Sequence, residues 1–168
     1  MGQKRPGDKR RDLTRLSADH QADDVVVELA LRDVAQKDEN TSYSVFVRTP
    51  GRMYTVAVYV TSGEVQSSLS TIKVKDDPEC GPGTVENKVD CEGLVVDRDS
   101  EADLVSTTIP RTCLGAPRWV RVGGLVAGLD LKHPSGGAEQ LTITADYWGP
   151  AGTTIRQLPP VGPKLRAG

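Results

Sequence analysis

Hydrophobic and polar residues alternate along most of this chain with a period of two, the spacing that turns one face of a β-strand toward a core. The clearest case runs from Val25 to Arg32, where valine or leucine stands at every odd position and the even positions include Glu28 and Ala30. Helical spacing of apolar residues is nearly absent. The pattern therefore predicts an all-β protein.

Turn-forming residues separate the alternating segments and predict where strands end. Pro50-Gly51 is a strong turn signal between residues 43–49 and 53–60, so these segments are expected to pair as a hairpin. Gly123-Gly124 predicts a bulge within a strand over 119–126. The other expected strands are residues 13–16, 65–74, 88–96, 104–109 and 141–148, and the expected loops include 20–23, 35–41, 76–83 and 129–138.

The number and spacing of these strands favour an antiparallel β-sandwich of about eight or nine strands, with a closed β-barrel as the alternative. The length of 168 residues suits a single domain, which we expect over 12–148. Residues 1–11 predict a flexible basic N-terminal tail, and residues 149–168 predict an extended tail rich in Pro and Gly.

Charge and hydropathy argue against two classes of partner. The formal net charge is -2, whereas nucleic-acid-binding proteins usually carry a basic surplus, and the one basic run lies in the N-terminal tail. No apolar run approaches the roughly 20 residues that span a bilayer. We therefore expect neither a nucleic-acid partner nor a membrane span.

The three cysteines, Cys80, Cys91 and Cys113, cannot all pair within one chain. Either one pair forms and one thiol is left over, or all three are reduced. None lies in a C-x-x-C motif and no histidine is near them in sequence, which disfavours a zinc site.

Two cysteine segments carry the pattern C-x-G-L, starting at Cys91, and P-R-x-C-L-G-x-P-R-W-V-R-V, starting at Pro110. With the opening segment over residues 12–34, they resemble a family of uncharacterised secreted proteins common in actinobacteria. The resemblance covers about residues 12–148. It implies a β-sandwich similar to sugar- and haem-binding sandwich modules, and it brings no established activity.

The resemblance also implies a disulfide between Cys91 and Cys113. A hairpin folded about residues 99–101 would bring both cysteines to its open end, which supports the same pair, and Cys80–Cys91 is the alternative. Cys80 departs from the two-cysteine pattern of the family, and a free thiol there would allow dimerisation. The resemblance implies secretion or cell-surface attachment, which requires a mature form because no apolar signal-peptide segment is present.

Four acidic residues alternate over residues 97–103 and form the sharpest metal-like pattern of the chain. Carboxylates at short intervals in a flexible loop suit calcium. The segment is not an EF-hand, because Ala102 and Thr108 stand where that motif needs Gly and Glu. The alternative is a solvated hairpin turn. The candidate ligands are Asp97, Asp99, Glu101 and Asp103.

Exposed aromatic side chains could bind a ligand, since sugar rings stack on them, and Trp119, Tyr147 and Trp148 are the candidates. Alternation places Val120 and Val122 on one strand face and Trp119 on the other. If the valines face the core, Trp119 is partly exposed and available to an arginine. Alternatively, Trp119 fills the core and the Tyr147-Trp148 pair anchors the C-terminal tail.

No catalytic or cofactor-binding constellation stands out. His20 and His133 are expected to be exposed in loops, and no nucleophile or phosphate-binding motif accompanies them. The leading hypothesis is a non-catalytic extracytoplasmic binding module whose partner is a glycan, a small molecule or a protein. A purely structural secreted domain is the alternative, and a hydrolase with paired carboxylates is the weakest.

Overall fold

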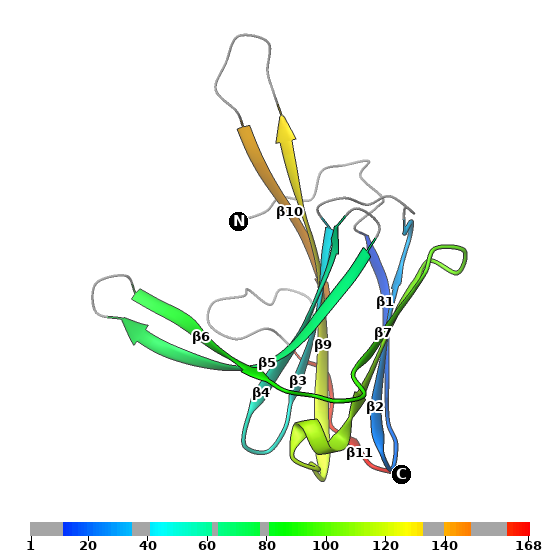
Figure 1. The fold of residues 1–168 in the computed structure, drawn as a ribbon, viewed down its shortest axis with the longest axis vertical. Coiled ribbons are helices and arrows are strands. Elements are labelled where there is room, and N and C mark those ends of the chain that lie inside the picture. Colours follow the sequence, from blue (N-terminus) through cyan, green and yellow to red (C-terminus); the bar gives the residue numbers. More distant parts are fainter. Residues whose placement is uncertain (1–11, 35–40, 62–63, 78–80, 133–139, 149–160) are drawn as a thin grey trace.

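The computed structural model describes residues 12–34, 41–61, 64–77, 81–132, 140–148 and 161–168. They form two antiparallel β-sheets packed face to face, together with one short 3-10 helix, η1 (Arg111–Leu114). The chain is therefore an all-β sandwich, as the sequence predicts (Figure 1). The described strands make two open sheets and not a closed barrel.

The smaller sheet has the strand order β1-β2-β8-β7. In β2 every second side chain is buried, and Val25, Val27 and Leu29 are 0% exposed. This confirms the alternation that predicted the strand. The four strands are β1 (Leu13–His20), β2 (Asp24–Leu31), β7 (Val95–Asp99) and β8 (Leu104–Pro110).

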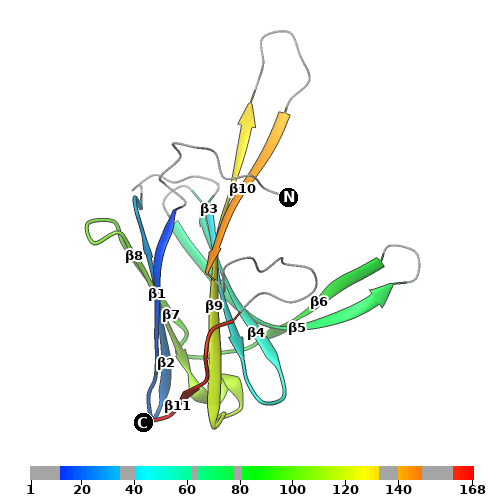
Figure 2. The same cartoon turned by 180° about the vertical axis from the view of Figure 1, so that it is seen from behind.

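The larger sheet has the order β10-β9-β3-β4-β5-β6, and β11 joins it beside β9. The predicted hairpin about Pro50-Gly51 is confirmed by the pairing of β3 with β4. The β5–β6 and β9–β10 hairpins extend beyond the sandwich as two arms (Figures 1 and 2). The strands are β3 (Thr41–Arg48), β4 (Met53–Thr61), β5 (Glu64–Asp77), β6 (Gly81–Val89), β9 (Trp119–Lys132), β10 (Gln140–Trp148) and β11 (Leu165–Arg166).

The core lies between the sheets and consists mainly of valine and leucine. The removal of these apolar side chains from water is the main force that holds the two sheets together. The largest side chains that are fully buried are Tyr43, Leu29, Leu69, Ile109, Val25, Val27, Val45, Val47, Val56, Val58, Val105 and Val120.

Gly124 allows the two sheets to approach closely. A Cβ atom there would lie 2.7 Å from Cδ2 of Leu29 in β2. The predicted bulge at Gly123-Gly124 is wrong, because the register between β3 and β9 is continuous through both residues. The irregularity lies instead in β1, between Leu13 and Arg15.

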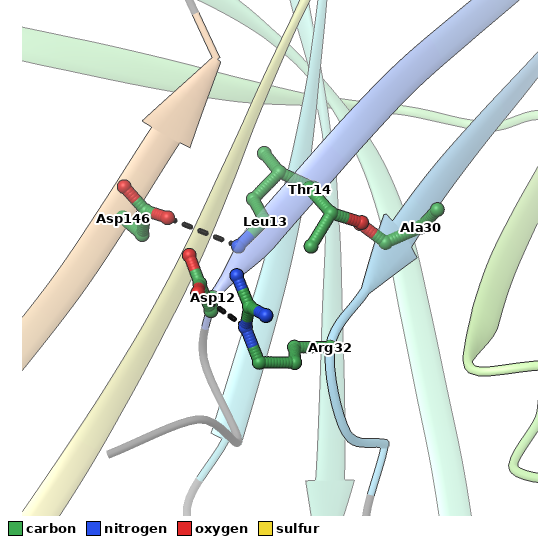
Figure 3. A network of polar contacts seen from close by, with 6 residues as sticks. All are labelled: Asp12, Leu13, Thr14, Ala30, Arg32 and Asp146. Atoms are coloured by element: carbon green, nitrogen blue, oxygen red, sulfur yellow. Dashed lines mark hydrogen bonds and ion pairs between the residues drawn. The ribbon is translucent and has the colours of Figure 1, made fainter. Parts of the chain in front are cut away.

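A polar contact also joins the two layers at the start of β1. The backbone N–H of Leu13 donates to Oδ2 of Asp146 in β10 at 3.0 Å (Figure 3). Close by, Nε of Arg32 donates to Oδ2 of Asp12 at 2.8 Å, which ties the chain before β1 to the end of β2. Asp146 therefore bonds across the sandwich from the edge of the larger sheet.

The predicted strand over 88–96 is wrong. The chain leaves the larger sheet after β6 and enters the smaller one at β7, with Gly93 in the left-handed region at φ 85°. The loops predicted over 76–83 and 129–138 are too long, because β5 continues to Asp77, β6 begins at Gly81 and β9 continues to Lys132. Alternation is weak over 76–83, so the sequence gives little sign that this segment pairs. Residues 129–132 do alternate, and this pattern was a readable sign that β9 continues.

Residues 161–168 of the predicted C-terminal tail contact both sheets. The N–H of Gly162 donates to the carbonyl of Val122, and β11 pairs with the start of β9. The N–H of Gly168 then donates to the carbonyl of His20, at the end of β1. The predicted tails over 1–11 and 149–160 lie outside the described residues.

Candidate functional site

A pocket of about 650 Å³ opens at the end of the sandwich where the β3–β4 turn approaches the segment after η1. We call it the aromatic pocket because Tyr54 and Trp119 line it. Figures 1 and 2 both show the turn and η1 side by side. The other lining residues are Thr49, Pro50, Gly51, Arg52, Leu114, Gly115, Ala116, Pro117 and Arg118.

One wall of the aromatic pocket is the turn over residues 49–52. The N–H of Thr49 donates to the carbonyl of Arg52 at 2.8 Å, and the N–H of Arg52 donates to Oγ1 of Thr49 at 3.2 Å. Pro50 has a fixed φ, which further limits the conformations of the turn. These contacts hold the backbone of Arg52 in one place.

The opposite wall is the segment over residues 114–119. Gly115 at φ 75° ends η1, and its N–H donates to the carbonyl of Thr112. Arg111 Nη2 donates to the carbonyl of Pro117 at 2.9 Å, so the arginine fixes the segment from behind.

The disulfide between Cys91 and Cys113 ties this wall to the crossover between the sheets. The Cα atoms of the two cysteines are 5.4 Å apart. This confirms the pairing that the family resemblance implies. Cys80, the third cysteine, lies outside the described residues.

Trp119 is half-buried at the start of β9, while Val120 and Val122 are buried in the core. Alternation had placed Trp119 and the valines on opposite faces, and of the two alternatives left open the structure shows the one in which the valines face the core. The cation on the indole ring is Lys164 and not an arginine, with Nζ at 4.5 Å from the ring centroid. This contact joins the C-terminal segment to the aromatic pocket.

Trp119, Tyr147 and Trp148 do not form one platform. Tyr147 pairs with Leu125 in β9. Leu125 is on the same strand face as Trp119, but it is six positions further along the strand, which is about 20 Å. Trp148 pairs with Gly124, whose missing side chain would point at Leu29. Trp148 is therefore on the opposite face from Trp119, and it is 40% exposed.

The acidic segment over 97–103 is the predicted hairpin turn between β7 and β8. Oδ1 of Asp99 accepts hydrogen bonds from the N–H groups of Glu101 and Ala102. Among the described residues, no three acidic, histidine or cysteine side chains are grouped as a metal site would require. The geometry of Asp97, Asp99, Glu101 and Asp103 gives the calcium hypothesis no support.

Asp103 should contribute to stability through a contact with the buried residue Val34, just after β2. Its Oδ1 accepts a hydrogen bond from the N–H of Val34 at 2.7 Å. Asp103→Ala is expected to lower the free energy of unfolding by about 1–2 kcal/mol, because that N–H loses its partner. Glu101→Ala, at an exposed position of the same turn, should change it by less than about 0.5 kcal/mol. Urea unfolding of both variants tests this, and equal values would contradict it.

The prediction of an exposed loop position for His20 is wrong. β1 continues through His20, which pairs with Val25 and is 2% exposed. Nδ1 lies 3.3 Å from the carbonyl oxygen of Leu165 in β11. The histidine therefore helps to hold the C-terminal segment against the sandwich. His133 lies outside the described residues.

A second pocket of about 550 Å³ lies on the other side of the 49–52 turn. We call it the basic pocket because Arg48, Arg52 and Lys73 line it. These residues were not among the predicted site residues, although two arginines flanking a Pro-Gly turn were a readable signal. The remaining lining residues are Thr49, Pro50, Gly51, Met53, Thr71, Ile72 and Asn87.

No protein-family model matches this chain, and no curated protein matches it either. The resemblance to the secreted family therefore stays a prediction. In the part of the chain that the structure describes, no helix is long and apolar enough to cross a membrane.

Proposed function

We propose that the protein is a non-catalytic binding module that acts outside the cytoplasm and holds its ligand in the aromatic pocket. The observation that carries the proposal is a half-buried tryptophan at a pocket whose two walls are fixed within the chain. Trp119 offers a flat apolar surface of the kind that dominates binding energy in many interfaces.

The fixed walls favour binding because little order is lost when a ligand enters. Hydrogen bonds hold the 49–52 turn, and Arg111 and the disulfide hold the 114–119 segment. A site that is already ordered avoids the entropic cost of immobilising loops and side chains.

The chemistry of the lining supports binding and not catalysis. Among the described residues that line the aromatic pocket, none carries a carboxylate, an imidazole or a thiol. General acid–base and nucleophilic catalysis usually rely on those groups.

The Cys91–Cys113 disulfide supports the extracytoplasmic part of the proposal. Disulfides persist in oxidising compartments and are rare in the cytosol of most organisms. The bridge therefore favours an exported protein, as the family resemblance implies.

Replacing Trp119 tests the site directly. Trp119→Ala should weaken binding of any ligand found in a screen of oligosaccharides and small molecules by roughly ten- to thirtyfold, since a central aromatic contact is lost. Titration calorimetry measures the change, and thermal melting shows whether the variant is folded. Trp148→Ala is the matched control and should bind as the parent does. Equal weakening by both variants, or none by Trp119→Ala, would contradict the proposed site.

A further inference from the structure

The charged residues that line the two pockets are all basic. Arg48, Arg52, Lys73 and Arg118 line them, and none of the lining residues is Asp or Glu. Arg52 lines both pockets, since the 49–52 turn separates them. The whole chain has 21 basic residues against 23 acidic ones, so this surplus is local.

Within the described part of the chain, these cations are not neutralised. In the part of the chain that the structure describes, none of the four forms an ion pair or a side-chain hydrogen bond. Exposed cations in that situation are fully available to an anion that enters either pocket.

A second observation points to the same end of the larger sheet. Arg48 in β3 stands directly opposite Arg121 in β9, and like charges in that relation destabilise a sheet. The Nε–H of Arg121 is buried and has no hydrogen-bond partner among the described residues. A bound anion near Arg48 would reduce the repulsion within this pair, although Arg121 itself lines neither pocket.

We infer that the ligand is an acidic oligosaccharide, an inference that rests on the binding function proposed above. One sugar ring packs against Trp119, while its carboxylate or sulfate groups bind Arg52 and Arg118 in the aromatic pocket. Arginine suits this role because its planar fork of donors matches the geometry of such anions.

An oligosaccharide suits the site better than a single small anion because the two pockets are adjacent. A chain that carries an anionic group on successive sugars can cross the 49–52 turn and reach Arg48 and Lys73 in the basic pocket. Arg52 then contacts the ligand at the crossing point, where it lines both pockets. A small anion would fill only one of them and would make no use of Trp119.

The test compares three probes by titration calorimetry with the full chain: a heparin-derived hexasaccharide, a galacturonic acid hexasaccharide and neutral maltohexaose. At least one acidic probe should bind, and maltohexaose should bind at least tenfold more weakly. The sulfated and the uronic probe distinguish the two sources of negative charge. Raising NaCl from about 50 to about 300 mM should weaken the acidic probe several-fold through screening.

Variants connect the binding to these side chains. Arg52→Ala should weaken the acidic probe roughly tenfold, the loss expected for one charge-assisted hydrogen bond, and Arg118→Ala should act similarly. Arg15→Ala removes the same charge from an exposed position of β1 in the other sheet and should bind as the parent does.

Several results would overturn the inference. If Arg15→Ala weakens the acidic probe as much as Arg52→Ala, or if neither acidic probe binds, the pockets do not recognise an acidic sugar. If maltohexaose binds as tightly as the acidic probes and Trp119→Ala abolishes that binding, the inference fails while the proposed binding function stands. Inorganic polyphosphate is a further control, because binding that Trp119→Ala leaves unchanged would mean that charge alone is recognised.

Discussion

Removing the disulfide should lower the free energy of unfolding by about 3 kcal/mol, measured as the double variant Cys91→Ala/Cys113→Ala. The bridge closes a loop between residues 22 positions apart. A cross-link over that length lowers the conformational entropy of the unfolded chain, which raises its free energy by about this amount. In a protein of 168 residues the melting temperature should fall by roughly 6–12 °C. Thermal melts and urea unfolding under non-reducing conditions provide both values.

The matched control is Cys80→Ser, which removes a thiol and leaves both bridged cysteines in place. Its melting temperature should change by much less than that of the double variant, because the bridge stays closed. A second expectation concerns the site, because the bridge anchors the 114–119 wall. The double variant should bind a ligand of the aromatic pocket more weakly at a temperature where it remains folded. A double variant as stable as the parent would contradict a structural role for the disulfide.

Leu29→Ala should cost about 3 kcal/mol of stability, comparable to the loss of the disulfide. Leu29 is 0% exposed in the middle of β2, and its side chain reaches across the sandwich to Gly124. Truncation of a fully buried leucine removes apolar contact and leaves a cavity, with a cost of roughly 2–5 kcal/mol. Urea unfolding followed by near-ultraviolet circular dichroism measures the change.

Val26→Ala is the control for this experiment. Val26 lies in the same strand but on the face that turns away from the core, and it is only half-buried. Its truncation should cost less than about 1 kcal/mol, because fewer contacts are lost. If the two variants were equally destabilised, the alternation of β2 would not separate a core face from an outer face.

The parts of the fold that the sequence predicts are those in which local pattern and tertiary burial agree. β2 faces a core on one side only, so its alternation is visible in the sequence. The Pro50-Gly51 turn determines its hairpin through local backbone preferences. The change of sheet after Val89 was missed because a single glycine, Gly93, marks it. The extent of β5 and β9 was missed because their outer parts leave the sandwich as arms (Figure 2).

The candidate site was predicted only in part, for a topological reason. Alternation in its own strand placed Trp119 opposite Val120 and Val122 but left open which of the two faces is buried. Its neighbours Arg52 and Tyr54 come from a hairpin more than 60 positions earlier in the chain, which only the pairing of β3 with β9 brings close. The local sequence pattern does not show which distant segments become neighbours in space. The same argument explains why the sequence could not show that Tyr147 and Trp148 lie away from Trp119 in the sheet.

The most direct test of the central claim, that the aromatic pocket is the ligand site, is a chemical-shift titration by ¹H–¹⁵N NMR. The probe is the heparin-derived hexasaccharide, with the galacturonic acid hexasaccharide as a second run. We expect the largest shifts at the indole N–H of Trp119 and at the backbone amides of the non-proline residues in 49–52 and 114–119. The indole N–H of Trp148 should stay in place. Shifts concentrated at Trp148 or over the 97–103 turn, with Trp119 unchanged, would contradict the account.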